Sequence, residues 1–482
     1  MKKILNYSLL LLPLVLLLQC LTTFKWLYIS DEIMIFARWL SWVLLALYGY
    51  KTDKSITFWI MLSMFIGAEI GYDFPVVAKN LQVLSKIFMK LIKCVIAPLL
   101  FGTLVVGIAG HSDMKQVGRM GVKALIYFEV VTTIALFIGL GAINFTKVGY
   151  GISAPTTAGK TDTVAVALLT AVVQADKSTK LITPDGRELN LQSKAIPKQD
   201  WQEIVLHTFP ENIAKSIAEG QVLQIVVFCL LFAFGLTQIP QEKKKSVLGF
   251  CESLSEVMFK FTKIIMYFAP IGVGGAMAYT IGTMGIDIFK NLLGLVATLY
   301  LALIFFILGV LLPIALYIKL PIRKFLKAVA EPASLAFATA SSEAALASAI
   351  KNMEEFGIPN KVVAFVLPTG YTFNLDGTTL YLSLASVFVA QAAGIEMSFG
   401  TQLVMVFTLM LTSKGVAGVA RASLIILAGT ASSFGLPDWP IAAILGVDAL
   451  MDMARTSVNV IGNSLATVFV AWWEGEWKAE QT

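Results

Sequence analysis

The sequence predicts an all-α polytopic membrane protein, and two observations support this prediction. Of its 482 residues, 57% are hydrophobic and only 14% are charged, and the mean hydropathy is +0.78. Such a composition leaves too little polar surface to cover soluble domains of this size. Many apolar stretches also reach the roughly 20 residues that a helix needs to cross about 30 Å of hydrocarbon. We therefore expect most of the chain to lie in lipid.

Short polar connections separate the apolar runs that we expect to form helices. These runs lie at residues 4–22, 33–50, 57–75, 85–110, 121–147, 222–240, 258–283, 289–318, 360–394 and 438–472. Two more stretches, 332–352 and 403–432, carry small and polar residues in the middle, and we expect each to re-enter the membrane on its own side. The first run follows two lysines and lacks a cleavage site, so we interpret it as a retained signal-anchor helix.

The charged residues indicate the orientation and exclude other classes of protein. Lys and Arg fall in short connections that each follow an even number of spans, which places these connections and the N-terminus in the cytoplasm. This pattern explains the net charge of +6 better than nucleic-acid binding does. Scattered cysteines and only two histidines argue against a disulfide framework and a zinc enzyme. The polar insert 148–215 is expected outside, with a turn at 184–186.

The last apolar run contains the strongest polar cluster. Its members fall within a wedge of roughly 100° on one helix face: Asp448, Asp452, Arg455, Thr456, Asn459 and Asn463. Because charge inside a membrane is costly, such a stripe predicts a functional site. One interpretation is an Asp–Arg pair that only holds helices together. The other is binding of an acidic amino acid, with a carboxylate on Arg455 and the ammonium on Asp452, and the additional polar residues favour it.

A second polar cluster interrupts the run 360–394. Gly370 and Gly377 flank Asn374 and Asp376 there, a composition that favours an unwound segment with exposed carbonyl groups. Carbonyls and a carboxylate suit a hard cation, so we predict an ion site, with Na+ at Asn374 and Asp376 as one candidate. The alternative is a kinked helix with a hydrogen-bonded asparagine. The two interrupted stretches, each followed by a span, also form a weak internal repeat.

Four motifs, in this order, give the sequence a specific resemblance. They are Ser341-Ser342-Glu343, Asn374-Leu375-Asp376-Gly377-Thr378, Ser413-Lys414-Gly415-Val416-Ala417-Gly418-Val419 and Asp452-Met453-Ala454-Arg455-Thr456-Ser457-Val458-Asn459-Val460. They look like the first hairpin tip, the Asn-Met-Asp-Gly-Thr motif, the second hairpin tip and the last-helix signature of one family. From about residue 57 to 475 the chain resembles the glutamate/aspartate and dicarboxylate:cation symporter family, and most closely its proton-coupled bacterial branch.

The resemblance implies a glutamate-transporter-homologue fold and a mechanism. Eight family transmembrane helices and two re-entrant helical hairpins would form a homotrimer, in which a transport domain moves against a fixed scaffold as an elevator. Two extra N-terminal helices would occupy 1–56. Scaffold and trimerisation helices would dominate 57–257, although the third family helix would belong to the transport domain. The transport domain would dominate 258–475, with hairpin 1 at 332–352, the broken helix at 360–394, hairpin 2 at 403–432 and the last helix at 438–472.

The resemblance also implies roles for single residues. Arg455 would bind the side-chain carboxylate of the substrate, and Asp452 its amino group. The remaining substrate-binding residues would be Ser341, Ser342, Thr378, Val419, Thr456 and Asn459. The cation-coupling residues would be Thr132, Thr133, Gly370, Thr372, Asn374, Asp376, Ser413, Asn459 and Asn463.

The sequence departs from the family pattern at three places. Asn463 stands where sodium-coupled members have an aspartate, which favours proton coupling. Ala347 and Ala420 replace a proline that is common at the hairpin tips, and two hydrophobic segments within 1–50 precede the first family helix. Buried carboxyl groups favour the protonated form. The candidate proton carriers are Glu129, Glu343, Asp376, Asp448 and Asp452.

These observations predict a secondary symporter of the bacterial inner membrane that imports L-glutamate or L-aspartate with protons or sodium and uses no cofactor. A C4-dicarboxylate:cation symporter is the alternative within this class. An anion channel or sensor on the same fold is the alternative from another class. An intramembrane enzyme has little support, because no His-based or Ser-based nucleophile arrangement is visible.

Overall fold

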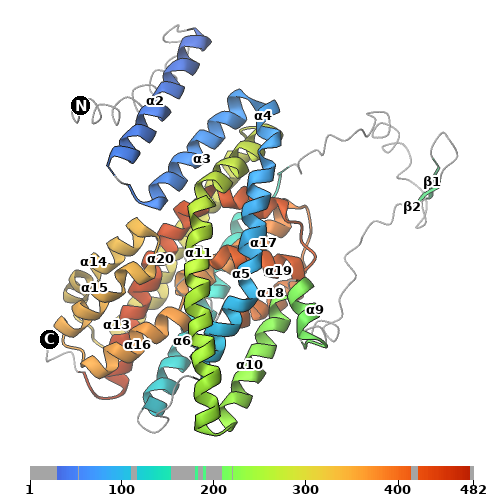
Figure 1. The fold of residues 1–482 in the computed structure, drawn as a ribbon. Helices are drawn as coiled ribbons and strands as arrows, with labels where there is room; N and C mark the ends of the chain where they lie inside the picture. Colours follow the sequence, from blue (N-terminus) through green and yellow to red (C-terminus); the bar gives the residue numbers. More distant parts are fainter. Residues whose placement is uncertain are drawn as a thin grey trace.

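The structure is a computed structural model that describes residues 30–52, 54–109, 117–152, 180–182, 188–190, 209–219, 221–413 and 422–477. These residues are helical apart from turns, short connections and one antiparallel pair, β1 (Lys180–Ile182) and β2 (Glu188–Asn190) (Figure 1). The sequence does not predict these strands, because three residues are too few to show alternation. The expected signal-anchor helix at 4–22 and most of the polar insert lie outside the described residues.

One group of helices, the scaffold bundle, surrounds the long helix α11 (Gln241–Met284). Its other members are α3 (Ile56–Asp73), α4 (Pro75–Asn80), α5 (Gln82–Ala109), α9 (Ile213–Glu219) and α10 (Val222–Gln238). The backbones of α3 and α11 nearly touch, since a Cβ built on Gly67 would lie 2.2 Å from the carbonyl oxygen of Gly274. Close approach at small residues is typical of helices that associate in lipid. Helix α2 (Asp31–Lys51) packs on α3.

A second group, the α20 group, surrounds α20 (Trp439–Trp473). Its other members are α6 (Val117–Thr146), α12 (Ile288–Phe306), the π-helix η1 (Ile307–Leu311), α13 (Leu312–Tyr317), α14 (Ile322–Thr339), α15 (Ser342–Glu355), α16 (Asn360–Phe373), α17 (Asp376–Ala392), α18 (Phe399–Thr412) and α19 (Ala422–Ser433). Helix α6 packs along α17, although α9, α10 and α11 of the scaffold bundle lie between them in sequence. Helix α17 is buried along almost its entire length and packs against both α6 and α20.

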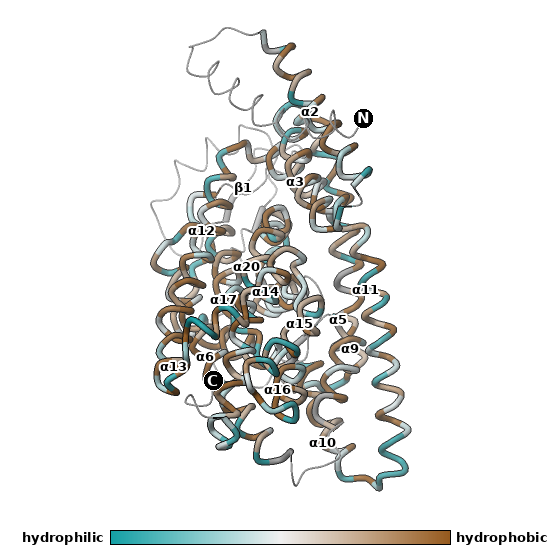
Figure 2. The backbone as a smooth tube through the Cα atoms, turned by 90° about the vertical axis from the view of Figure 1, so that its left-hand side faces the viewer, coloured by the Kyte–Doolittle hydropathy of each residue, from teal (hydrophilic) through white to brown (hydrophobic). Residues whose placement is uncertain are grey.

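Apolar positions dominate most helices, as Figure 2 shows. Four helices of the described chain are long and apolar enough to cross a membrane: Glu32–Lys51, Arg119–Thr146, Gln241–Met284 and Ile288–Tyr317. The third begins well before the apolar run at 258–283, because its first turns are polar but still helical. The chain is therefore a multi-pass membrane protein in which at least one helix extends beyond the apolar layer.

Two local breaks shape the α20 group. Helices α14 and α15 meet at Ala340, whose φ of 50° places a residue with a side chain in the left-handed region. Ser341 then caps α15 by accepting a hydrogen bond from the Ala344 N–H at 3.4 Å. The other break separates α16 from α17, where Asn374 and Leu375 leave the helical conformation, with ψ of 73° and 64°. This second break directs backbone N–H groups toward α20.

Candidate functional site

The N-terminus of α17 lies against the middle of α20, and Asn459 joins them. Its Oδ1 accepts hydrogen bonds from the N–H groups of Gly377 (2.8 Å) and Thr378 (3.3 Å), and its Nδ2 donates to Thr378 Oγ1 (2.9 Å). The first N–H groups of a helix have no partner within it, so a side-chain acceptor satisfies them. A Cβ on Gly377 would lie 2.4 Å from the carbonyl oxygen of Arg455, which explains why the backbones can approach only at glycine.

Arg455 is the buried cation of this site, with 1% of its surface exposed. Its Nη1 donates to Asp448 Oδ1 at 3.0 Å and its Nε to Asp452 Oδ1 at 2.9 Å. The guanidinium carbon lies 4.1 Å from the centre of the Tyr381 ring, a cation–π contact from α17. Thr456 Oγ1 lies 3.4 Å from the same Asp452 oxygen. The structure thus contains the Asp–Arg pairs, and it adds Thr456 and Tyr381 to them.

The second polar cluster is also brought together, at the break between α16 and α17. Asn374 Nδ2 donates to Asp376 Oδ2 at 3.2 Å and to Asn463 Oδ1 at 3.1 Å, while Asn463 Nδ2 donates to the Asn374 carbonyl at 3.1 Å. All three side chains are 0% exposed. A Cβ on Gly370 would lie 2.2 Å from Asn463 Oδ1, so the cluster depends on this glycine.

Sequence reasoning missed several members of these clusters. A Cβ on Gly462 would lie 2.1 Å from Asp376 Oδ2, so this glycine makes room for the carboxylate. The only signal is its place beside Asn463 on the polar face of the last helix. Tyr381 of α17 is another such member, since its ring lies against the Arg455 guanidinium. An aromatic residue in an apolar helix gives no signal of this kind in the sequence.

Other predicted site residues lie outside these clusters or make local contacts. Ser341 and Ser342 lie at the start of α15, and Glu343 follows in its first turn. Thr132 donates to the Phe128 carbonyl at 2.7 Å on its own helix, and Thr133 approaches Met410 Sδ at 3.5 Å. Ser413 donates to the Met410 carbonyl at 3.3 Å. Glu129 lies on α6 and Thr372 on α16. Val419 lies outside the described residues, as does Ala420.

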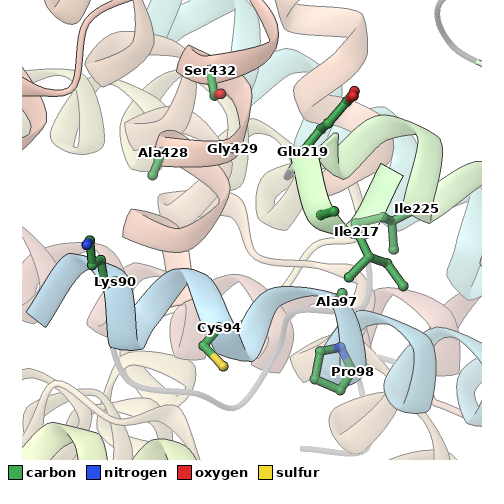
Figure 3. Close-up of a pocket in the computed structure, with 11 residues that line it drawn as sticks. Lys90, Cys94, Ala97, Pro98, Ile217, Glu219, Ile225, Ala428, Gly429 and Ser432 are labelled. Carbon is green, nitrogen blue, oxygen red and sulfur yellow. The ribbon is translucent and has the colours of Figure 1, made fainter. Parts of the chain in front are cut away.

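A cavity of about 390 Å³ lies apart from both clusters, between the scaffold bundle and α19 (Figure 3). Lys90, Cys94 and Pro98 of α5 line one side, and Gly429 and Ser432 of α19 line another. The polar residues of α20 do not line it. The side chains of the two clusters are themselves buried.

Among the described charged residues of the two clusters, carboxylates outnumber cations. Asp376, Asp448 and Asp452 supply three negative charges and Arg455 one positive charge, which gives these four buried residues a net charge of −2 when all are ionised. Buried charge without compensation is costly. The described residues contain no group of three or more His, Cys, Asp or Glu side chains that could hold a metal ion, so the carboxylates do not converge on one point.

The motifs, their order and the buried polar face of α20 identify the family. The chain matches the sodium:dicarboxylate symporter family over residues 56–473. It belongs to this family. Members are transporters, so the chain is a transporter and not an enzyme, and the resemblance read from the motifs is confirmed. Among the described helices, only α2 precedes the range that matches the family.

Curated relatives match a similar share of the chain. A C4-dicarboxylate transport protein of Bacillus subtilis (strain 168) is 39% identical over 427 residues, which cover 88% of this chain and 95% of the relative. A proton/sodium-glutamate symport protein of Bacillus caldotenax is 38% identical, with 88% and 94% covered. A proton/glutamate-aspartate symporter of Escherichia coli (strain K12) is 38% identical, with 87% and 92% covered.

Proposed function

We propose that this family member imports L-glutamate or L-aspartate across the bacterial inner membrane together with protons. The observation that carries the proposal is Arg455, a fully buried guanidinium beside Asp452, Thr456 and Asn459 on one face of α20. A guanidinium fork binds a carboxylate in bidentate fashion, and Asp452 provides a partner for an ammonium. The names of two relatives, which refer to glutamate and to glutamate-aspartate, support the same substrate class.

Coupling to a cation follows from the charge of the site. Four buried residues already have a net charge of −2, and an acidic amino acid would add a further −1. Bringing that anion into a closed, buried site without cations would leave uncompensated charge in a medium of low dielectric. Cations that enter with the substrate remove this cost, so the solute and the cations bind together or not at all.

We assign the proton to Asp376. Asp448 and Asp452 both accept hydrogen bonds from the Arg455 guanidinium and form ion pairs with it. Asp376 is 0% exposed and accepts a hydrogen bond from the neutral amide of Asn374. Asn463 adds a second neutral amide in place of a carboxylate, and it binds Asn374 on two sides. The described hydrogen bond of the Asp376 carboxylate thus comes from an uncharged amide, whereas Asp448 and Asp452 each accept one from a guanidinium.

We further propose that the α20 group moves against the scaffold bundle in a homotrimer, as an elevator. The two groups pack mainly within themselves, and the tip between α14 and α15 meets the scaffold bundle at a single described hydrogen bond, from Thr57 Oγ1 to the Thr339 carbonyl at 3.3 Å. One weak bond at a helix tip can break and reform readily. The homotrimer rests on the family resemblance.

A C4-dicarboxylate is the second candidate substrate, because the relative from Bacillus subtilis carries that name. Asp452 discriminates between the two candidates. A substrate without an ammonium would meet this carboxylate with no opposite charge to offer it, and the two would repel. The presence of both Asp448 and Asp452 beside one arginine therefore favours the amino acid.

Uptake of labelled aspartate into proteoliposomes tests the proposal. We expect accumulation under an inward proton gradient alone, and none under a sodium gradient alone. Excess unlabelled succinate should compete less effectively than unlabelled glutamate. Accumulation that requires sodium would contradict the coupling proposal, and accumulation of succinate but not of aspartate would contradict the substrate proposal.

A further inference from the structure

Helix α2, which lies before the family-matched range, carries a buried charge. Arg38 is 6% exposed and contacts two carboxylates of α3. Its Nη2 lies 2.6 Å from Asp73 Oδ1, and its Nε contacts Glu69 Oε1. Trp39 Nε1 donates to the other oxygen of Asp73 at 3.0 Å. We call Arg38, Trp39, Glu69 and Asp73 the α2–α3 clamp.

The spacing of the acidic residues on α3 suits the reach of Arg38 from α2. Glu69 and Asp73 are four residues apart, so they lie on one face of α3, one turn from each other. The planar fork of Arg38 reaches both carboxylates at once. Trp42, one turn after Arg38, stacks on Phe65 of α3 with ring centres 5.9 Å apart and an angle of 10° between the planes. The described polar side-chain partners of Arg38 and Trp39 therefore belong to α3.

The clamp makes each helix depend on the other. Without α2, the two carboxylates of α3 would lie beside apolar surface with no guanidinium, and without α3 a guanidinium would lie in the middle of an apolar helix. The opposite face of α2 is apolar and exposed, as expected for a face in contact with lipid. Its residues are 41–78% exposed: Ile33, Phe36, Leu40, Val43, Leu47 and Tyr50.

We propose that α2 is a permanent outer helix of the scaffold bundle, fixed by the α2–α3 clamp, and that it stays fixed to α3 while the α20 group moves. Helix α3 is itself locked to α11 at the Gly67–Gly274 contact, so α2 is joined through α3 to the centre of the bundle. The statement about movement rests on the proposed elevator, whereas the clamp does not.

The first experiment measures the clamp alone, by the melting temperature of the purified protein in detergent. Arg38→Gln leaves two carboxylates uncompensated, so we expect a fall of several degrees. Arg38→Gln combined with Glu69→Gln and Asp73→Asn removes the charge on both sides, and we expect it to recover most of that loss. If the single variant melts like the parent protein, or if the triple variant is no more stable than the single one, the clamp is refuted.

The second experiment measures movement by cross-linking in a variant without native cysteines. Trp42→Cys with Phe65→Cys, joined by a short bifunctional thiol reagent, should transport aspartate as fast as the same variant before joining. Loss of uptake on joining would overturn the proposal. Thr57→Cys with Thr339→Cys, joined in the same way, should lose uptake. If this second pair still transports when joined, the elevator is wrong but the clamp stands.

Discussion

Arg455 Nη1 lies 3.0 Å from Oδ1 of Asp448, so two residues separated by two turns of α20 form a buried ion pair. The same guanidinium binds Asp452 through Nε at 2.9 Å. Each carboxylate thus holds a different edge of one guanidinium. These two hydrogen bonds use two of the five N–H groups of the guanidinium, so a substrate carboxylate need not displace both aspartates. The Asp452 variant below tests the role of one of them.

The substitution Asp452→Asn should weaken the binding of aspartate more than the binding of succinate. The neutral amide cannot pair with an ammonium, and the loss of a charge-assisted hydrogen bond of roughly 1.5–3 kcal/mol corresponds to about a tenfold or greater loss of affinity. Succinate has no ammonium, and the variant removes a repulsive charge, so succinate binding should weaken by less than about threefold or become stronger. Competition with labelled uptake measures both. Asp438→Asn, an exposed acid at the start of α20, serves as the matched control. Equal effects on both substrates would contradict the role of Asp452.

Asp376→Asn should separate exchange from accumulation. The amide resembles the protonated carboxyl group but cannot release a proton, so the site should bind and exchange substrate without responding to a proton gradient. We expect near-parental exchange of internal unlabelled for external labelled aspartate, with accumulation under a proton gradient lost. Accumulation that survives in Asp376→Asn would assign the proton to another carboxyl group.

Gly462→Ala should disrupt the cluster at Asp376. The new methyl group would lie 2.1 Å from Asp376 Oδ2, so the carboxylate or the backbone must shift, at a cost of about 1–3 kcal/mol. We expect at least about a tenfold loss of uptake. Gly446→Ala on the same helix is the control, because its methyl group would meet the flexible Met277 Cε at 2.5 Å, which can move aside. If both variants lost uptake to a similar degree, the effect would reflect a general intolerance of α20 to substitution of glycine and not a specific effect on Asp376.

The C-terminal end of α20 should make stability depend on pH. Glu474 lies 2.8 Å from Arg119 Nη2 and 2.6 Å from Lys123 Nζ. Burial raises the pKa of its carboxyl, but the hydrogen bonds and charges of Lys123 and Arg119 outweigh burial, and the pKa lies below its usual value of 4.5. A carboxyl whose folded-state pKa is lowered stabilises the protein above its unfolded pKa, and this stabilisation disappears as pH falls through the folded value.

Melting temperatures in detergent at about pH 6 and about pH 3.5 check this dependence. Glu474→Gln should melt lower than the parent at the higher pH, and the difference should shrink at the lower pH. Asp287→Asn provides the control, because Asp287 and Lys290 form a pair with 83% and 84% of their side chains exposed, and such pairs contribute little. A difference between parent and Glu474→Gln that persists or grows in acid would contradict the assignment.

The sequence predicts much of this fold because its signals are local. The polar spacing from Asp448 to Asn463 follows directly from the helical period, and the motifs identify the family. Gly370 and Gly377 indicate an unwound segment, and the helix does break next to them, at Asn374. The pairing of Asp448 with Arg455 could be anticipated as the alternative to substrate binding, from a separation of seven residues.

Other features depend on contacts between distant segments. Tyr381 and Gly462 join the clusters only because α17 crosses α20 at a particular point, and no local pattern records that crossing. The partners of Arg38 lie more than thirty positions away, at Glu69 and Asp73. The strands β1 and β2 are too short to leave a periodic signal.

The bonds of Asn459 have a consequence for turnover. This side chain already binds the N-terminus of α17 and Thr378, as Arg455 already binds its own aspartates. An arriving solute therefore replaces some existing hydrogen bonds, and its affinity is the difference between the bonds gained and the bonds lost. The empty carrier is already stabilised by bonds within its own site, so the return step does not expose these polar groups without partners.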